Sequence, residues 1–109
     1  MDCALTEKKC TPCEGSVKAL HGEALAEFQS ELGRGWTLVE GLRLEREFKF
    51  KNFREALDFT NAVGDLAEAE GHHPDIYLAW GKVRITLWTH AAKGLTENDF
   101  ILAAKIDGL

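Results

Sequence analysis

Two stretches of the chain alternate apolar and polar residues, and this alternation limits the fold more than any other feature. One covers residues 42–50 and the other residues 83–88; their apolar positions are Leu42, Leu44, Phe48, Phe50, Val83, Ile85 and Leu87. A period of two places such side chains on one face of a β-strand. Each stretch follows a glycine and a short apolar run, so we predict two β-hairpins, each with one face in water. The last strand is expected to end at His90, on its polar side.

Three other segments have the apolar periodicity of helices. The first covers residues 16–32 and is stopped by the glycines that follow it. The second starts after Asn52, which resembles the first residue of a capping box, and ends near Glu70. The third begins with a capping box made by Thr96 and Asp99. The order helix, hairpin, helix, hairpin, helix predicts an α+β fold: a four-stranded antiparallel sheet with three helices packed on one face.

A chain of 109 residues has room for one compact core. We expect a single domain over residues 16–109, preceded by an N-terminal arm over residues 1–15. Of the seven residues 100–106 in the third helix, only Lys105 is charged. A surface helix needs apolar residues on one stripe only, so we expect this helix to be covered by its own sheet and by another subunit. This predicts a homo-oligomer, either a dimer or a tetramer.

The charge pattern excludes several classes of partner. Thirteen Lys and Arg against eighteen Asp and Glu give a formal net charge of -5, and the basic residues are dispersed. Direct contact with nucleic acid is therefore not expected. No apolar stretch of the sequence approaches the length of a membrane span. Residues 1–7 also lack the basic start and long apolar stretch of a signal peptide. We expect a cytoplasmic protein with no membrane contact.

All three cysteines, Cys3, Cys10 and Cys13, lie in the first thirteen residues. Their odd number in a protein expected to be cytosolic argues against a disulfide framework. The pair Cys10 and Cys13 has C-x-x-C spacing, but a zinc site would need two more ligands, and a redox motif should lie between a strand and a helix. We interpret this segment as a surface arm, with a metal or redox role as the alternative.

Three of the four histidines, His72, His73 and His90, lie in or beside one predicted hairpin, between the carboxylates Glu68 and Asp99. Each residue also has a purely structural interpretation: Asp99 as part of a capping box, Glu68 as a solvated helix residue, and a histidine as a partner of the helix dipole. Clustering of three histidines in so small a domain is harder to explain by packing, because histidine titrates near neutrality and is the usual proton carrier.

The motifs around these histidines resemble the pterin-4a-carbinolamine dehydratases of the bacterial type. The matching residues are Glu68 to Pro74, Tyr77, Val83 to Leu87, Thr89, His90, Gly94 to Thr96 and Asp99. The resemblance covers about residues 36–109, and a leader like residues 9–15 also occurs in bacterial members. Trp88 departs from the animal sequences, which have a small residue there.

The resemblance implies dehydration of 4a-hydroxytetrahydrobiopterin to quinonoid dihydrobiopterin, which recycles the pterin cofactor of aromatic amino acid hydroxylases. N5 of the pterin can expel the 4a hydroxyl if an acid protonates the leaving oxygen and a base takes the N5 proton, so no metal or cofactor is expected. By resemblance, His72 and His90 transfer protons, and which is the acid stays open.

The resemblance also suggests roles for the residues around that pair. His73 would bind and orient the pterin, Glu68 would orient His72, and Asp99 and Thr89 would supply polar contacts. Trp36 would offer a flat wall against the ring.

Two other functions are compatible with these residues. Animal members resembling this chain also act as dimerisation cofactors of a homeodomain transcription factor, so a protein-binding module is the main alternative. A metal site made of His, Glu and Asp is the other, although no H-x-x-x-H spacing supports it.

Overall fold

A computed structural model describes residues 5–10, 18–32 and 35–109. Its elements in chain order are the 3₁₀ helix η1 (Leu5–Glu7), α1 (Gly22–Leu32), β1 (Thr37–Val39), β2 (Arg43–Lys49), α2 (Phe53–Glu70), β3 (Asp75–Ala79), β4 (Lys82–Leu87), the 3₁₀ helix η2 (His90–Ala92) and α3 (Glu97–Asp107). The caps predicted at Asn52 and Thr96 are present: Asn52 accepts a hydrogen bond from the Glu55 backbone, and Thr96 and Asp99 form a full capping box.

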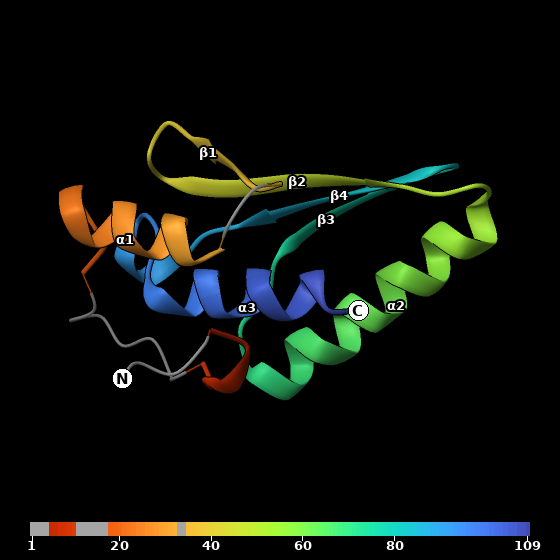
Figure 1. The fold of residues 1–109 in the computed structure, drawn as a ribbon. Coiled ribbons are helices and arrows are strands. Elements are labelled where there is room, and N and C mark those ends of the chain that lie inside the picture. Colours follow the sequence, from red (N-terminus) through yellow and green to blue (C-terminus); the bar gives the residue numbers. More distant parts are fainter. Residues whose placement is uncertain (1–4, 11–17, 33–34) are drawn as a thin grey trace.

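The strands form one antiparallel sheet in the order β1-β2-β4-β3. β1 pairs with β2 and β3 pairs with β4 as two hairpins, and β2 pairs with β4 over six residues, with Leu44 opposite Leu87 and Phe48 opposite Val83. All three helices lie on the same side of this sheet (Figure 1). The predicted α+β fold, a four-stranded antiparallel sheet covered by three helices on one face, is therefore confirmed.

Two predicted boundaries are wrong. The first helix begins at Gly22 rather than residue 16; residues 18–21 are not helical, and residues 16 and 17 lie outside the described residues. The backbone N–H of Leu20 donates instead to the Leu95 carbonyl, so this segment is held against a distant loop. The strand β4 ends at Leu87, and His90 begins η2, because Thr89 bridges to Gly94 and closes a loop there.

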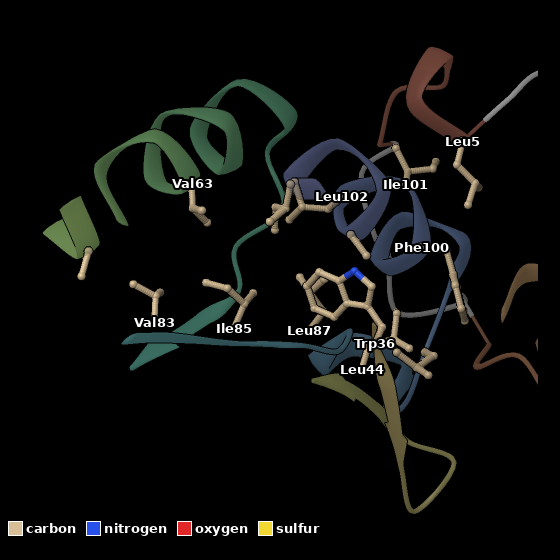
Figure 2. Packing of buried hydrophobic residues seen from close by; sticks show 14 residues of the cluster. Leu5, Trp36, Leu44, Val63, Val83, Ile85, Leu87, Phe100, Ile101 and Leu102 are labelled. Carbon is tan, nitrogen blue, oxygen red and sulfur yellow. The ribbon is translucent and has the colours of Figure 1, made fainter. Parts of the chain in front are cut away.

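The apolar residues of α3 are buried within a single chain. Phe100, Leu102 and Ala103 have no exposed surface, and Ile101 is 2% exposed. Together with core residues of the sheet they form one cluster (Figure 2), packed against α2, α1 and η1. The Phe28 ring of α1 is stacked 5.5 Å from Phe100. The apolar run therefore needs no second subunit to cover it. The expectation that another subunit covers this helix is wrong, because α3 is a central helix and not a surface helix.

The described part of the N-terminal segment packs against the domain. Leu5 of η1 is 5% exposed and belongs to the hydrophobic core beside Ile101 (Figure 2). Cys10 is half-buried, whereas Cys3 and Cys13, and with them the C-x-x-C pair, lie outside the described residues. Among the residues that the structure describes, no helix combines the length and apolar character needed to cross a bilayer.

Candidate active site

The end of α2 sets the directions of the two neighbouring histidines. Gly71 has φ +67°, a left-handed conformation that favours glycine, and its N–H donates to the Ala67 carbonyl. The backbone N–H of His72 donates to the same carbonyl at 3.2 Å. Beyond this turn the side chain of His72 points inward and is 10% exposed, whereas that of His73 is 61% exposed.

Asp99 is completely buried in the first turn of α3, and its two carboxylate oxygens have different partners. Oδ1 lies 2.6 Å from Nε2 of His72. Oδ2 accepts hydrogen bonds from the Thr89 hydroxyl at 2.8 Å and the Thr96 backbone N–H at 2.9 Å. The hydroxyls of Thr89 and Thr96 lie 2.8 Å apart. Asp99 is thus a capping-box residue and the partner of a histidine at once.

These contacts fix the orientation of the His72 ring. A carboxylate that receives donors from Thr89 and Thr96 acts as an acceptor, so Nε2 of His72 carries the hydrogen that points to Asp99. Nδ1 is then the ring nitrogen that can accept or return a proton. A buried carboxylate behind a histidine also stabilises the imidazolium that forms when Nδ1 is protonated.

Glu68 contacts a different histidine from the one we predicted. Its Oε2 is hydrogen-bonded to Nε2 of His73, and both side chains are mostly exposed. The prediction that Glu68 orients His72 is wrong, because Asp99 occupies that position. Five residues separate Glu68 from His73 across the end of α2, and the left-handed turn at Gly71 brings His73 back to it.

His90 stands on the surface beside an aromatic ring. Its imidazole centroid is 3.9 Å from the Trp88 ring, at an interplanar angle of 40°. The Trp88 indole N–H donates to Asp75 Oδ2 at 3.3 Å, and the guanidinium of Arg43 lies 5.6 Å from the Trp88 centroid. Our sequence reasoning assigned no role to Trp88 or Asp75. The alternation of β4 did carry a clue, because it placed Trp88 on the open face of the sheet.

The structure brings most predicted site residues to one end of the domain. His72, Asp99 and Thr89 are in direct contact, His90 follows Thr89, and Glu68 and His73 flank His72 along the chain. The carboxyl end of α2, the end of β4 and the first turn of α3 carry these groups. Among the residues described, no three His, Cys, Asp or Glu side chains form a group that could hold a metal ion.

Trp36 lies elsewhere. It is 5% exposed in the core, packs against Phe48, and donates its indole N–H to Asp107 at 3.0 Å. Asp107 is eight residues beyond Asp99 on α3, a separation of about 12 Å along the helix. In this chain Trp36 is a core residue (Figure 2) whose indole N–H is paired with Asp107, and it is not placed to form the wall that we predicted for it.

The sequence profile of the pterin 4 alpha carbinolamine dehydratase family matches residues 18–109. The chain belongs to this family. That membership confirms the resemblance drawn from the histidine motif. The match begins beyond the cysteine-containing leader and includes every candidate site residue.

Bacterial members of the family are similar over nearly the full chain. A relative from Alkaliphilus metalliredigens, provisionally named a pterin-4-alpha-carbinolamine dehydratase, is 53% identical over 103 residues, which are 94% of this chain and 93% of the relative. A relative from Rubrobacter xylanophilus with the same provisional name is 53% identical over 105 residues, which are 96% of this chain and 97% of the relative.

Two solved structures share the fold. A Brucella melitensis protein described as a transcriptional coactivator/pterin dehydratase has a TM-score of 0.75 and 34% sequence identity. The match covers 84% of this chain and 97% of the Brucella chain. The other is a pterin dehydratase-like protein identified as a RuBisCO assembly factor in the alpha-carboxysome, with a TM-score of 0.59 and 25% sequence identity. The match covers 71% of this chain and 90% of that protein's chain.

Proposed function

We propose that this chain is a hydro-lyase that dehydrates 4a-hydroxytetrahydrobiopterin to quinonoid dihydrobiopterin and so recycles the cofactor of aromatic amino acid hydroxylases. Membership of the dehydratase family supports this function. The single observation that carries it at the level of residues is the buried pair of His72 and Asp99, 2.6 Å apart, which orients an imidazole for proton transfer.

The reaction divides between an acid and a base. The N5 lone pair of the pterin expels the 4a hydroxyl, an acid protonates the departing oxygen, and a base accepts the N5 proton, so that one water leaves. We assign these two roles to His72 and His90. Asp99 orients the His72 ring by accepting a hydrogen bond from Nε2, and Thr89 holds Asp99 in place. Which histidine is the acid depends on the 4a stereoisomer that is bound.

The remaining residues would bind the substrate. His73, oriented by Glu68 through Nε2, is exposed and leaves Nδ1 available for a hydrogen bond to a polar edge of the pterin. The Trp88 ring beside His90 offers the flat apolar surface that we had expected from Trp36. Neither a metal nor an organic cofactor has a part in this mechanism.

A role in protein binding is the second candidate, because the similar Brucella protein is described as a coactivator as well as a dehydratase. A binding module alone would not need a buried histidine–aspartate pair behind an exposed histidine. Detectable turnover of a 4a-hydroxypterin distinguishes the two functions.

We also propose that the enzyme is a cytoplasmic homo-oligomer, a dimer or tetramer. The support now comes from the edge strand β3 and its turn, where Ile76, Tyr77 and Trp80 are 37%, 49% and 69% exposed. Analytical ultracentrifugation of the wild type tests this, and a monomer at micromolar concentration would contradict it. Leu102→Glu is unsuitable as a test because Leu102 is fully buried within one chain and the variant would unfold.

The decisive experiment is a stopped-flow assay in which 4a-hydroxytetrahydropterin is generated and its loss is followed with and without the enzyme. We expect acceleration by wild type and its near-complete loss in His72→Ala. A matched control is Arg46→Gln, which removes an ion pair with Asp107 at the opposite end of α3. No acceleration by the folded wild-type protein would refute the proposed function.

A further inference from the structure

Glu70 is a nearly buried carboxylate two residues before His72, and the reaction described above gives it no role. Its side chain is 6% exposed. Oε2 accepts a hydrogen bond from Nζ of Lys105 at 2.7 Å, and Oε1 accepts one from the backbone N–H of Cys10 at 2.9 Å. One carboxylate therefore joins the end of α2, the last turn of α3 and the N-terminal segment (residues 5–10).

The same N-terminal segment also holds the beginning of α3. The thiol of Cys10 lies 3.5 Å from the Asn98 carbonyl, and Nζ of Lys8 lies 2.7 Å from Oε2 of Glu97. Glu97 and Asn98 directly precede Asp99. The segment thus connects a residue just before His72 to the two residues just before Asp99.

The geometry of the active site depends on this connection. His72 and Asp99 are 27 positions apart, one just after α2 and the other in the first turn of α3, so the 2.6 Å contact exists only while the end of α2 is held against the start of α3. His72 itself follows a helix end, where the backbone has fewer internal hydrogen bonds to hold it. Proton transfer is sensitive to displacements of about 1 Å, which can reduce the rate by roughly 10²-fold.

Glu70 can accept both hydrogen bonds as a charged group because its carboxyl is ionised. The hydrogen bond from Lys105, and after it the hydrogen bond from the Cys10 backbone, lower the pKa of the Glu70 carboxyl below its usual range. The ion pair with Lys105 is largely removed from water, with the Lys105 side chain 16% exposed, so solvent screens it less than a surface pair.

We propose that Glu70 is a positioning residue of the active site, which ties α2 to Lys105 of α3 and to the N-terminal segment and thereby sets the contact between His72 and Asp99. The proposal rests on the proposed dehydratase function for its kinetic consequence. Its structural consequence, a defined hydrogen-bonded state of the His72 ring, can be measured without any substrate.

The test compares Glu70→Ala, Glu70→Gln and Lys105→Met with the control Arg46→Gln, which breaks an ion pair to Asp107, in the same last turn of α3 as Lys105 but outside the link through Glu70. Turnover gives kcat and KM, thermal melting gives stability, and nitrogen NMR of the imidazole rings gives the tautomer of His72. We expect Glu70→Ala to lower kcat by about tenfold or more with a smaller change in KM, and to shift the His72 tautomer. Glu70→Gln, which can still accept from the Cys10 N–H, should recover part of the loss.

The control separates positioning from stability. Arg46→Gln should lower the melting temperature while kcat stays within about twofold of wild type. The proposal is overturned if folded Glu70→Ala keeps wild-type kcat, or if kcat falls while the His72 signals stay unchanged. Should Glu70→Ala fail to fold, Glu70→Gln and Lys105→Met carry the same comparison. An inactive wild type would refute the dehydratase function alone, because the His72 signals would still decide whether Glu70 positions the ring.

Discussion

Nε2 of His72 lies 2.6 Å from Oδ1 of Asp99, while the other oxygen of the same carboxylate receives the Thr96 N–H that caps α3. The first turn of a helix and the orientation of a reactive imidazole thus share one buried side chain. A change at Asp99 can therefore alter both the cap of α3 and the orientation of His72, and experiments on this site have to measure stability and turnover together.

The first prediction concerns His72 and His90, the two histidines proposed to transfer protons. Replacing His72 or His90 by Ala should lower kcat by roughly 10²- to 10⁴-fold, because each removes a proton donor or acceptor from the transition state. His73→Ala should instead act mainly on KM. The double variant should lose less than the sum of the single losses, measured by kcat for both 4a stereoisomers. Folded single variants with near wild-type kcat would contradict the assignment.

Asp99→Asn tests the hydrogen-bonded state of His72. The amide oxygen of the new side chain can still accept the hydrogen bond from the Thr96 N–H. In that orientation the amide NH₂ points toward Nε2 of His72. Nε2 must then accept, so the ring hydrogen moves to Nδ1. We expect a kcat loss of roughly 10²-fold or more with the fold retained, by analogy with other histidine–aspartate pairs. Nitrogen NMR of His72 reports the tautomer directly. An unchanged tautomer with full activity would show that Asp99 only caps the helix.

The stability of the protein should depend on pH through Glu70. The pKa of Glu70 is lowered in the folded state, chiefly by Lys105. The stabilisation that Glu70 contributes is therefore fully present above its usual pKa in the unfolded chain. It is lost as pH falls through the pKa of Glu70 in the folded protein. The difference in melting temperature between wild type and Glu70→Gln should therefore be largest near neutral pH and shrink in acid. A difference that stayed constant from neutral pH to about pH 3 would contradict this.

The cysteines should be replaceable without loss of function. Cys10→Ser with Cys13→Ser should leave turnover and oligomeric state unchanged, because Glu70 is bound by the backbone N–H of residue 10, which serine retains. Burial, and then the nearby Glu70 charge, raises the pKa of the Cys10 thiol to about 12, so Cys10 should react slowly with alkylating reagents in the native protein. Mass spectrometry after timed alkylation measures this. Loss of a bound metal or of activity in the double cysteine variant would contradict this prediction.

Activity should survive exhaustive treatment with EDTA. Expulsion of the 4a hydroxyl is driven by N5 and proton transfer, so no Lewis acid is needed. The check is turnover before and after dialysis against the chelator, with metal content measured in both samples. Loss of turnover that added zinc restores would require a different mechanism.

Local patterns in the sequence were sufficient for the architecture. The period-two alternation over residues 83–88 and the capping pairs at Asn52 and Thr96 depend on neighbouring residues only, and the structure confirms the strand and both helix starts. The histidine motif likewise placed the chain in its family. These features were predictable because each rests on contacts within a few residues along the chain.

Only the tertiary structure decided which side chains meet. The family resemblance suggested Glu68 as the partner of His72, but Asp99, from α3, occupies that position. Trp36 and Leu5 are core residues for the same reason: their neighbours come from α3, which lies far along the chain. Burial of α3 within one chain and the link from Cys10 to Glu70 also join distant segments. Such contacts follow from how helices pack on the sheet, and no local pattern of residues records that packing.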